Sequence, residues 1–129
     1  MAQVKIYASC AHIDANRKRI SDLIHQVLVA SVGLPEDKRF HRFIPLASEN
    51  FIYPAGRSAA YTIIEISMFE GRSPEAKKDL LNGLMRGFVE DLAMAAEDVE
   101  ITIFETPRAN WGIRGQIAAD LVLDYKVEV

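Results

Sequence analysis

The sequence predicts one α/β domain, of the α+β kind, in which two β-α-β units form a four-stranded sheet with both helices on one face. Three observations predict this fold. A pattern that covers about residues 2–47 recurs over about 60–106, so the chain contains an internal repeat. Each copy begins and ends with a short β-like segment, and apolar residues at helical spacing lie between the two segments. The 129 residues, half of them apolar, suffice for one core.

The strands are predicted from alternation of apolar and polar residues. The first copy alternates over residues 4–7, VKIY, and the second over residues 64–68, IEISM. A period of two residues is typical of a strand with one buried face. The closing strands of the two units are expected at residues 40–44 and 99–104.

Each opening strand is followed by a predicted amphipathic helix. The apolar stripes are Ile20, Leu23, Ile24, Val27 and Leu28 in the first unit, and Leu80, Leu81, Leu84, Met85, Phe88 and Leu92 in the second. We expect Asp14 to cap the first helix and residues 33–35, Gly-Leu-Pro, to end it. Residues 73–75, Ser-Pro-Glu, are typical of a helix start and predict where the second helix begins.

Strand-helix-strand crossovers of this length make parallel strand pairs. The sheet face away from the helices would carry Lys5, Tyr7, Glu65, Ser67, Thr102 and Phe104. This mixture is too apolar to face water alone, so a second layer is expected. The alternating run at about 121–129 predicts an edge strand that can pair with a neighbouring chain. Together these features predict a homo-oligomer.

Composition excludes several classes of partner. The chain has 15 Lys and Arg against 18 Asp and Glu, a formal net charge of -3, and therefore no basic surface typical of binding to nucleic acid or membranes. No segment reads as a signal peptide or a transmembrane helix. Cys10 is the only cysteine, so no intrachain disulfide is possible, and we expect a cytoplasmic protein.

Common cofactor motifs are absent from the sequence. His12, His25 and His41 lack metal-ligand spacing with one another and with Cys10, so we expect no metal site. No phosphate-binding loop, dinucleotide fingerprint or nucleophile elbow is present. The common nucleotide-dependent and hydrolase classes are therefore not predicted.

Five stretches resemble the tautomerase superfamily, and most closely its fused members similar to malonate semialdehyde decarboxylase. They are residues 33–40, 61–73, 77–78, 105–112 and 113–115, in that order. The resemblance covers nearly the whole chain. It implies a tautomerase or MIF-like fold, a homotrimer, a small carboxylate ligand and no cofactor.

The chain departs from this family at the residue that usually carries the chemistry. Members begin with a proline whose amine moves a proton, whereas this chain has Ala2. The resemblance implies that the amine of Ala2 is the base, or forms a Schiff base, only if Met1 is removed; a retained Met1 would plug the site. The family's catalytic acid falls on Lys38, although a small shift of the loop would let the adjacent Asp37 take its place. The first of the family's two arginines falls on Glu70.

The second family arginine is retained as Arg72, between a strand end and a helix start. It is a candidate carboxylate ligand, with an ion pair to another subunit as the alternative. Trp111 is expected either to wall the pocket or to pack on a neighbouring subunit. Arg114 is expected to bind the carboxylate or to pair with Asp120 or Asp124.

Tyr53 and Arg57, in the segment that joins the halves, either reach the pocket or only pack. The resulting hypothesis is a tautomerase-like enzyme that performs proton transfer, decarboxylation or hydration on a small 2-oxo or unsaturated carboxylic acid. Its activity would be altered because Ala2 replaces the proline. The alternative is a non-catalytic oligomer that binds a carboxylate or serves as a scaffold, with a decayed site.

Overall fold

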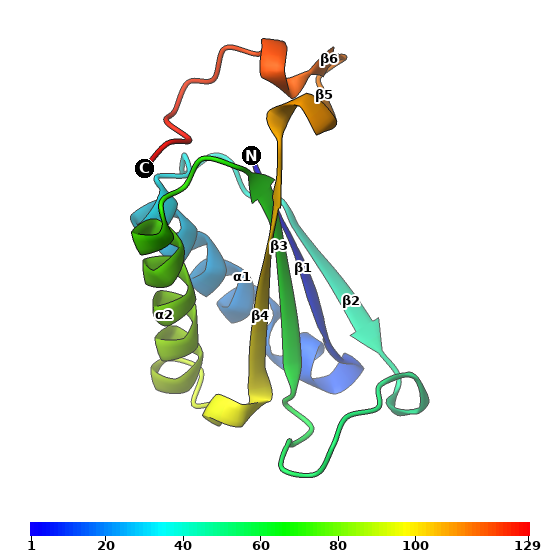
Figure 1. The fold of residues 1–129 in the computed structure, drawn as a ribbon. Coiled ribbons are helices and arrows are strands. Elements are labelled where there is room, and N and C mark those ends of the chain that lie inside the picture. Colours follow the sequence, from blue (N-terminus) through cyan, green and yellow to red (C-terminus); the bar gives the residue numbers. More distant parts are fainter.

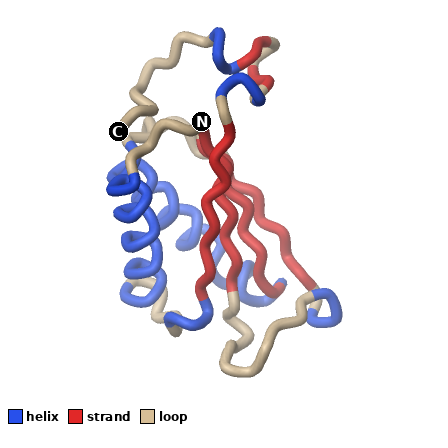
Figure 2. The backbone as a smooth tube through the Cα atoms, viewed as in Figure 1, coloured by secondary structure: helices blue, strands red, loops and turns tan.

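A computed structural model describes all 129 residues as one mixed sheet with two helices on one face (Figures 1 and 2). Its main elements are β1 (Ala2–Ser9), α1 (Cys10–Val32), β2 (His41–Leu46), β3 (Thr62–Phe69), α2 (Pro74–Glu90) and β4 (Val99–Thr106). The strands lie in the order β2-β1-β3-β4. The predicted fold class is therefore confirmed. Neither helix has the length and apolar character needed to cross a membrane.

The sheet joins two parallel units through an antiparallel centre. β1 runs parallel to β2, and β3 runs parallel to β4, as the crossovers predict. β1 and β3 are antiparallel, so that Ile6 lies between Phe43 and Ile64. As a consequence, β1 and β3 begin at opposite ends of the sheet.

The core lies between the helices and the facing side of the sheet. Val4, Ile6, Ile64 and Ile66 are fully buried, which confirms the period-two pattern. A Cβ at Gly87 of α2 would overlap the side chain of Leu23 on α1, which shows that the two helices approach closely at this glycine.

The stripe predicted for α2 is correct on its inner side only. Leu80, Leu84 and Phe88 are fully buried, whereas Met85 is 44% exposed. Leu92 lies beyond the helix, which ends at Glu90. The buried face of α2 therefore contains fewer apolar residues than the sequence pattern predicts.

Two helix ends follow the predicted signals. The Ser73 side chain caps α2 by accepting a hydrogen bond from the Ala76 amide, and Pro74 opens the helix. Gly33 ends α1 with a φ of 69° and donates its amide to the carbonyls of Leu28 and Val29.

The predicted cap of α1 is wrong. β1 runs directly into α1, which begins at Cys10, and Ser9 provides the cap by accepting from the His12 amide at 3.1 Å. Asp14 lies one turn inside the helix and pairs with Arg17 at 2.9 Å. The error arose because a strand that passes straight into a helix leaves no loop to mark the boundary.

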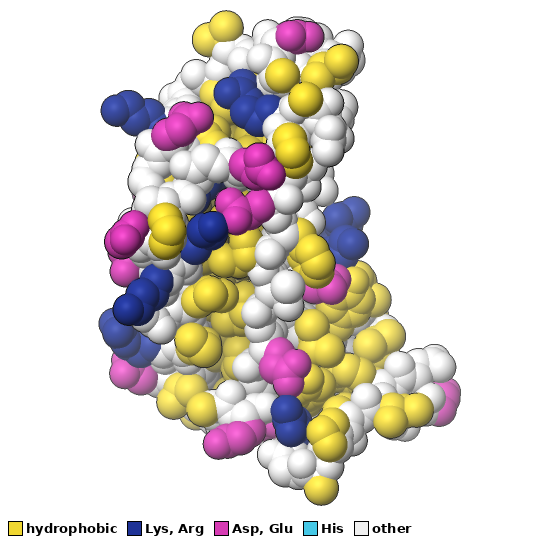
Figure 3. Space-filling model, in the orientation of Figure 1, with side chains coloured by type: hydrophobic (Ala, Val, Ile, Leu, Met, Phe, Trp, Pro, Cys, Tyr) yellow, Lys and Arg dark blue, Asp and Glu magenta, His cyan; other side chains and the backbone are white.

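The sheet face away from the helices is uncovered in the single chain. Phe104 is 48% exposed there, and the Tyr7 hydroxyl donates to Glu65 at 2.7 Å. Figure 3 shows hydrophobic side chains gathered over the sheet on the side away from the helices.

Residues 121–129, predicted as an edge strand that can pair with a neighbouring chain, form no strand within the single chain. After β4 the chain forms a short β5 (Gly112–Ile113) and β6 (Gln116–Ile117) pair and then returns without strand pairing toward the N-terminus (Figure 1). Val127 is 2% exposed, and the Val129 carbonyl accepts from the Ser73 amide at 3.0 Å. The alternation of apolar residues thus correctly indicated that one side of this segment is buried. That side packs on the end of the sheet within the same chain.

Candidate functional site

The start of the chain is buried at the end of the sheet where β1 begins and β3 ends. Met1 is 7% exposed and Ala2 is 1% exposed. Met1 forms a second small core with Phe69, Ala118 and Val127, and partly buried apolar residues surround it. Those residues are Trp111, Ile113, Leu121, Leu123 and Tyr125. The segment after β4 therefore covers the N-terminus.

The terminal amine occupies an apolar and cationic environment. It donates a hydrogen bond to the Tyr125 hydroxyl. Burial, with smaller contributions from the charges of Arg72, Arg108 and Arg114, lowers the pKa of the amine from 8.0 to about 5. An amine with this pKa is neutral at pH 7 and can accept a proton.

Arg72 lies at the same end of the sheet as this amine and has unused hydrogen-bonding capacity. It follows β3, is 4% exposed, and donates from Nη1 to the Phe69 carbonyl at 3.0 Å. Its Nε and Nη2 atoms are buried and have no acceptor. Burial lowers the pKa of this arginine, and Tyr125 opposes the shift. Buried donors without partners are costly, so the pair of free N–H groups suits a carboxylate.

The other two arginines have different roles. Arg108 donates to the carbonyls of Ala118 and Leu121 at 3.0 and 2.9 Å, which fixes the segment that covers the site. Arg114 lines the cavity and forms no ion pair with an aspartate. Its φ of 54° is unusual for a residue other than glycine.

A small cavity adjoins Met1, and its free volume is about 10 Å³. That volume is about what one water molecule requires. The lining residues are Met1, Lys38, Phe69, Ile113, Arg114, Leu121, Leu123 and Tyr125. Six of the eight are apolar or aromatic, and no acidic residue is among them. Met1 thus fills space that would otherwise belong to the cavity.

The structure brings the five predicted site residues to the same end of the sheet. Lys38 and Arg114 line the cavity, Ala2 lies one residue inward from Met1, and Arg72 acts on the amine. Trp111 lies behind the lining, with its ring centroid 5.0 Å from that of Phe69. Trp111 therefore packs within its own chain and supports the wall from outside.

Two neighbours of the predicted residues do not reach the cavity. Asp37 and Glu70 are exposed and are not among its lining residues. The position of the family's catalytic acid is therefore filled by Lys38 with no substitute from Asp37. No carboxylate lies on the cavity wall.

Tyr53 and Arg57 lie at the opposite end of the sheet, where β3 begins. Arg57 pairs with Glu100 at 3.0 Å and lies over the ring of Tyr61, whose centroid is 5.7 Å away. Tyr53 packs against the same ring, with centroids 5.0 Å apart. Of the two predicted roles, the structure shows packing.

Tyr125 and Arg108 are not among the residues that the sequence predicts for the site. Tyr125 belongs to the alternating run at 121–129, and alternation predicts that its side chain points inward but not which residues it contacts. Arg108 follows β4 within the 105–112 stretch, but no pattern marked it as a residue near the N-terminus.

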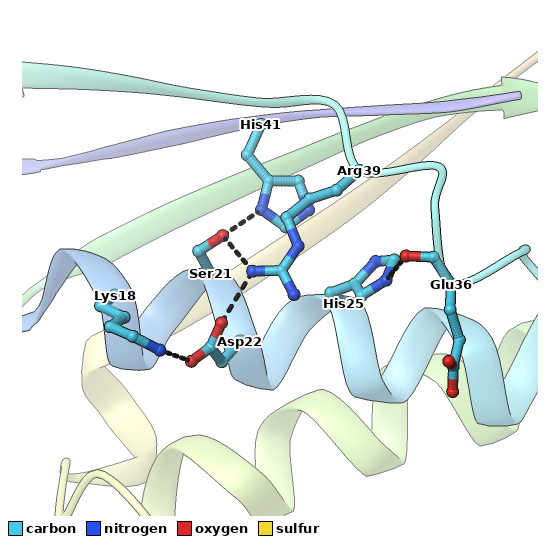
Figure 4. Close-up of polar contacts among 7 residues, drawn as sticks. All are labelled: Lys18, Ser21, Asp22, His25, Glu36, Arg39 and His41. Atoms are coloured by element: carbon cyan, nitrogen blue, oxygen red, sulfur yellow. Dashed lines mark hydrogen bonds and ion pairs between the residues drawn. The ribbon is translucent and has the colours of Figure 1, made fainter.

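A larger hollow elsewhere has a different character. It is an open groove between α1 and the start of β2, and its walls are mainly charged. Figure 4 shows that these charges satisfy one another: Asp22 accepts from Lys18 and Arg39, both at 2.7 Å. Those two cations hold the pKa of Asp22 at about 2.

The histidines of this region are also engaged in local contacts. His41 Nδ1 lies 2.8 Å from the Ser21 hydroxyl. Burial, together with the charges of Arg39 and His25, lowers the pKa of His41 to about 4. His25 Nε2 lies 2.8 Å from the Glu36 carbonyl oxygen (Figure 4). The groove therefore offers a self-paired polar surface and no free cation like Arg72.

Comparisons with known proteins agree with the fold. The family described as "Tautomerase enzyme" matches residues 38–114. A 2-hydroxymuconate tautomerase of Comamonas testosteroni is 39% identical over 57 residues, which are 44% of this chain and 90% of that protein.

Two solved structures share the architecture. Malonate semialdehyde decarboxylase has a TM-score of 0.79 at 22% identity, with coverage of 93% of this chain and 99% of the other. A fused 4-OT, described as a symmetric trimer, has a TM-score of 0.77 at 21% identity, with coverage of 91% and 96%.

The lowered pKa of the terminal amine gives a direct prediction. With ¹⁵N-labelled methionine in a chain that retains Met1, the amine nitrogen resonance should titrate with a midpoint near pH 5. The folded pKa lies below the unfolded value, so the folded state gains stability as pH rises from about 5 to 8. Arg114→Gln removes a cation and should raise the midpoint. A midpoint near 8, as for a solvated amine, would contradict the described burial.

Proposed function

The chain belongs to the tautomerase family, and on this premise we propose that it is a cytoplasmic homotrimer that transfers a proton at carbon in a small 2-oxo or unsaturated carboxylic acid. Decarboxylation and hydration use the same groups and are related outcomes. One observation carries the proposal: the start of the chain, Met1 and Ala2, is buried at the same end of the sheet as Arg72, an arginine with two free donors.

The proposed base is the amine of Ala2, freed by removal of Met1. Met1 occupies the space next to the cavity in the described chain, and Ala2 is almost fully buried behind it. Without Met1, the new amine lies at the inner end of that space. A primary amine lacks the ring that orients proline, so the strand position of Ala2 has to orient it.

The proposed reaction is a proton shuttle. Arg72 binds the substrate carboxylate through its two free N–H groups, which places the 2-oxo group and the neighbouring C3 carbon in the cavity. The neutral amine takes a proton from C3, and the electron pair moves onto the 2-oxo oxygen. Arg114, which lines the cavity, is the cation that offsets this charge. Return of the proton to C3 restores both partners.

The trimer rests on the uncovered sheet face. Phe104 is 48% exposed on a face that also carries Tyr7 and Ile63, and a sheet with helices on one side only needs a second layer. The similar fused 4-OT is described as a trimer. The single cysteine fits the reducing cytoplasm.

Proton exchange at carbon tests the proposed activity. A cleavable fusion that releases the chain at Ala2, verified by mass spectrometry, should exchange the C3 protons of 2-oxobutanoate in D₂O faster than buffer, as followed by NMR. Arg72→Gln should lower kcat/KM by about 10- to 100-fold, because it removes a charge-assisted carboxylate contact. Arg17→Gln changes an exposed arginine on α1 and should leave the rate unchanged.

An Ala2→Pro variant separates this proposal from a decayed, non-catalytic site. Exchange by the Ala2 protein itself supports the proposal. Exchange that appears only in the proline variant would show that the natural chain retains the pocket but has lost the base.

Oligomeric state is a separate prediction. Sedimentation equilibrium should give three times the 14.4 kDa chain mass. Phe104→Glu places a charge on the uncovered sheet face and should shift the protein to monomers. Val89→Glu, on α2 and 40% exposed, should remain trimeric. A monomeric unmodified protein would contradict the proposed assembly.

A further inference from the structure

We infer that the site selects 2-oxo monocarboxylic acids with a short, unbranched apolar tail, and that Met1 marks the volume available to them. This inference rests on the proposed function, because it assigns the substrate class of the same site.

The volume that Met1 occupies indicates the size of substrate that the site can accommodate. It is 7% exposed, and only about 10 Å³ remains free beside it. Removal of Met1 therefore opens a space about the size of a methionine residue. A 2-oxo acid of five carbons has as many non-hydrogen atoms as a methionine residue. An acid of this length fills the space, and longer acids collide with its wall.

The wall suits an apolar tail. Phe69, Ile113, Leu121, Leu123 and Tyr125 surround the thioether side chain of Met1, which is itself a linear apolar group. Each methylene that such a wall removes from water contributes about 0.8 kcal/mol, or about fourfold in affinity. Affinity should therefore rise with tail length until the space is filled.

The cations favour one anionic head group. Arg114 lines the cavity, and Arg72 and Arg108 follow β3 and β4 at the same end of the sheet, so positive charge is concentrated near the start of the chain. Arg108 is already occupied by two backbone carbonyls, which leaves Arg72 and Arg114 for the ligand. This end of the site therefore accommodates the 2-oxo carboxylate.

A second carboxylate has no comparable partner. Lys38 also lines the cavity, but it is only partly buried. An ion pair with a solvated ammonium contributes little, whereas a carboxylate among Leu121 and Leu123 loses its hydration. Dicarboxylates should therefore bind more weakly than apolar monocarboxylates of the same length.

Calorimetric titration of the chain that begins at Ala2 tests the inference without requiring turnover. The ligands are pyruvate, 2-oxobutanoate, 2-oxopentanoate, 2-oxohexanoate and the dicarboxylate 2-oxoglutarate. We expect 2-oxopentanoate to bind at least tenfold more tightly than pyruvate and 2-oxoglutarate, with a decline at 2-oxohexanoate. The chain that begins at Met1 should bind none of them.

Two adjacent variants provide matched tests of the wall. Leu123 lines the cavity and is partly buried, whereas Val122 is 95% exposed. Leu123→Ala should move the optimum from 2-oxopentanoate to 2-oxohexanoate, because it lengthens the apolar space. Val122→Ala should leave the ranking of the five acids unchanged.

The outcomes separate this inference from the proposed activity. Length-dependent binding without proton exchange would contradict the activity and support the substrate class. Proton exchange with equal affinity for all tail lengths, or with tighter binding of 2-oxoglutarate, would overturn the substrate class alone. If none of the five acids binds, both the substrate class and the proposed activity are overturned.

Discussion

Burial of the chain's first amine beside three arginines is the constraint on which the site depends. Desolvation disfavours the ammonium form, and the nearby guanidinium groups disfavour it further. The result, in the chain that retains Met1, is an amine that is neutral at physiological pH, at the end of the sheet that also carries Arg72, a cation with two unused donors. A base beside an anion-binding group is the minimum that proton transfer on a carboxylic acid requires.

The fold creates this arrangement through the direction of its strands. Because β1 and β3 are antiparallel, the start of β1 lies beside the end of β3 and therefore beside Arg72. The segment after β4 then covers this space. It is held by the hydrogen bond from Arg108 to the Ala118 carbonyl and by the one from the Ser73 amide to the Val129 carbonyl. A contact between residues 1 and 125 is thus a product of topology.

The sequence predicted the fold through local and repeated signals. Alternation located the strands, and Ser73 and Gly33 located two helix ends, because these signals depend on neighbouring residues. The cap at Ser9 was missed since β1 and α1 have no loop between them. The segment that contains Tyr125 was misread because alternation reports an inward side but not which surface it meets. Met1 as a filler of the cavity follows only from three-dimensional packing.

Reductive trapping of the N-terminus tests the central claim most directly. The chain that begins at Ala2 is incubated with pyruvate and cyanoborohydride at pH 6, and peptides are then analysed by mass spectrometry. Imine formation requires a neutral amine, so the account predicts that Ala2 is modified well before any lysine side chain. Modification of lysines at an equal or greater rate, with Ala2 unmodified, would contradict it.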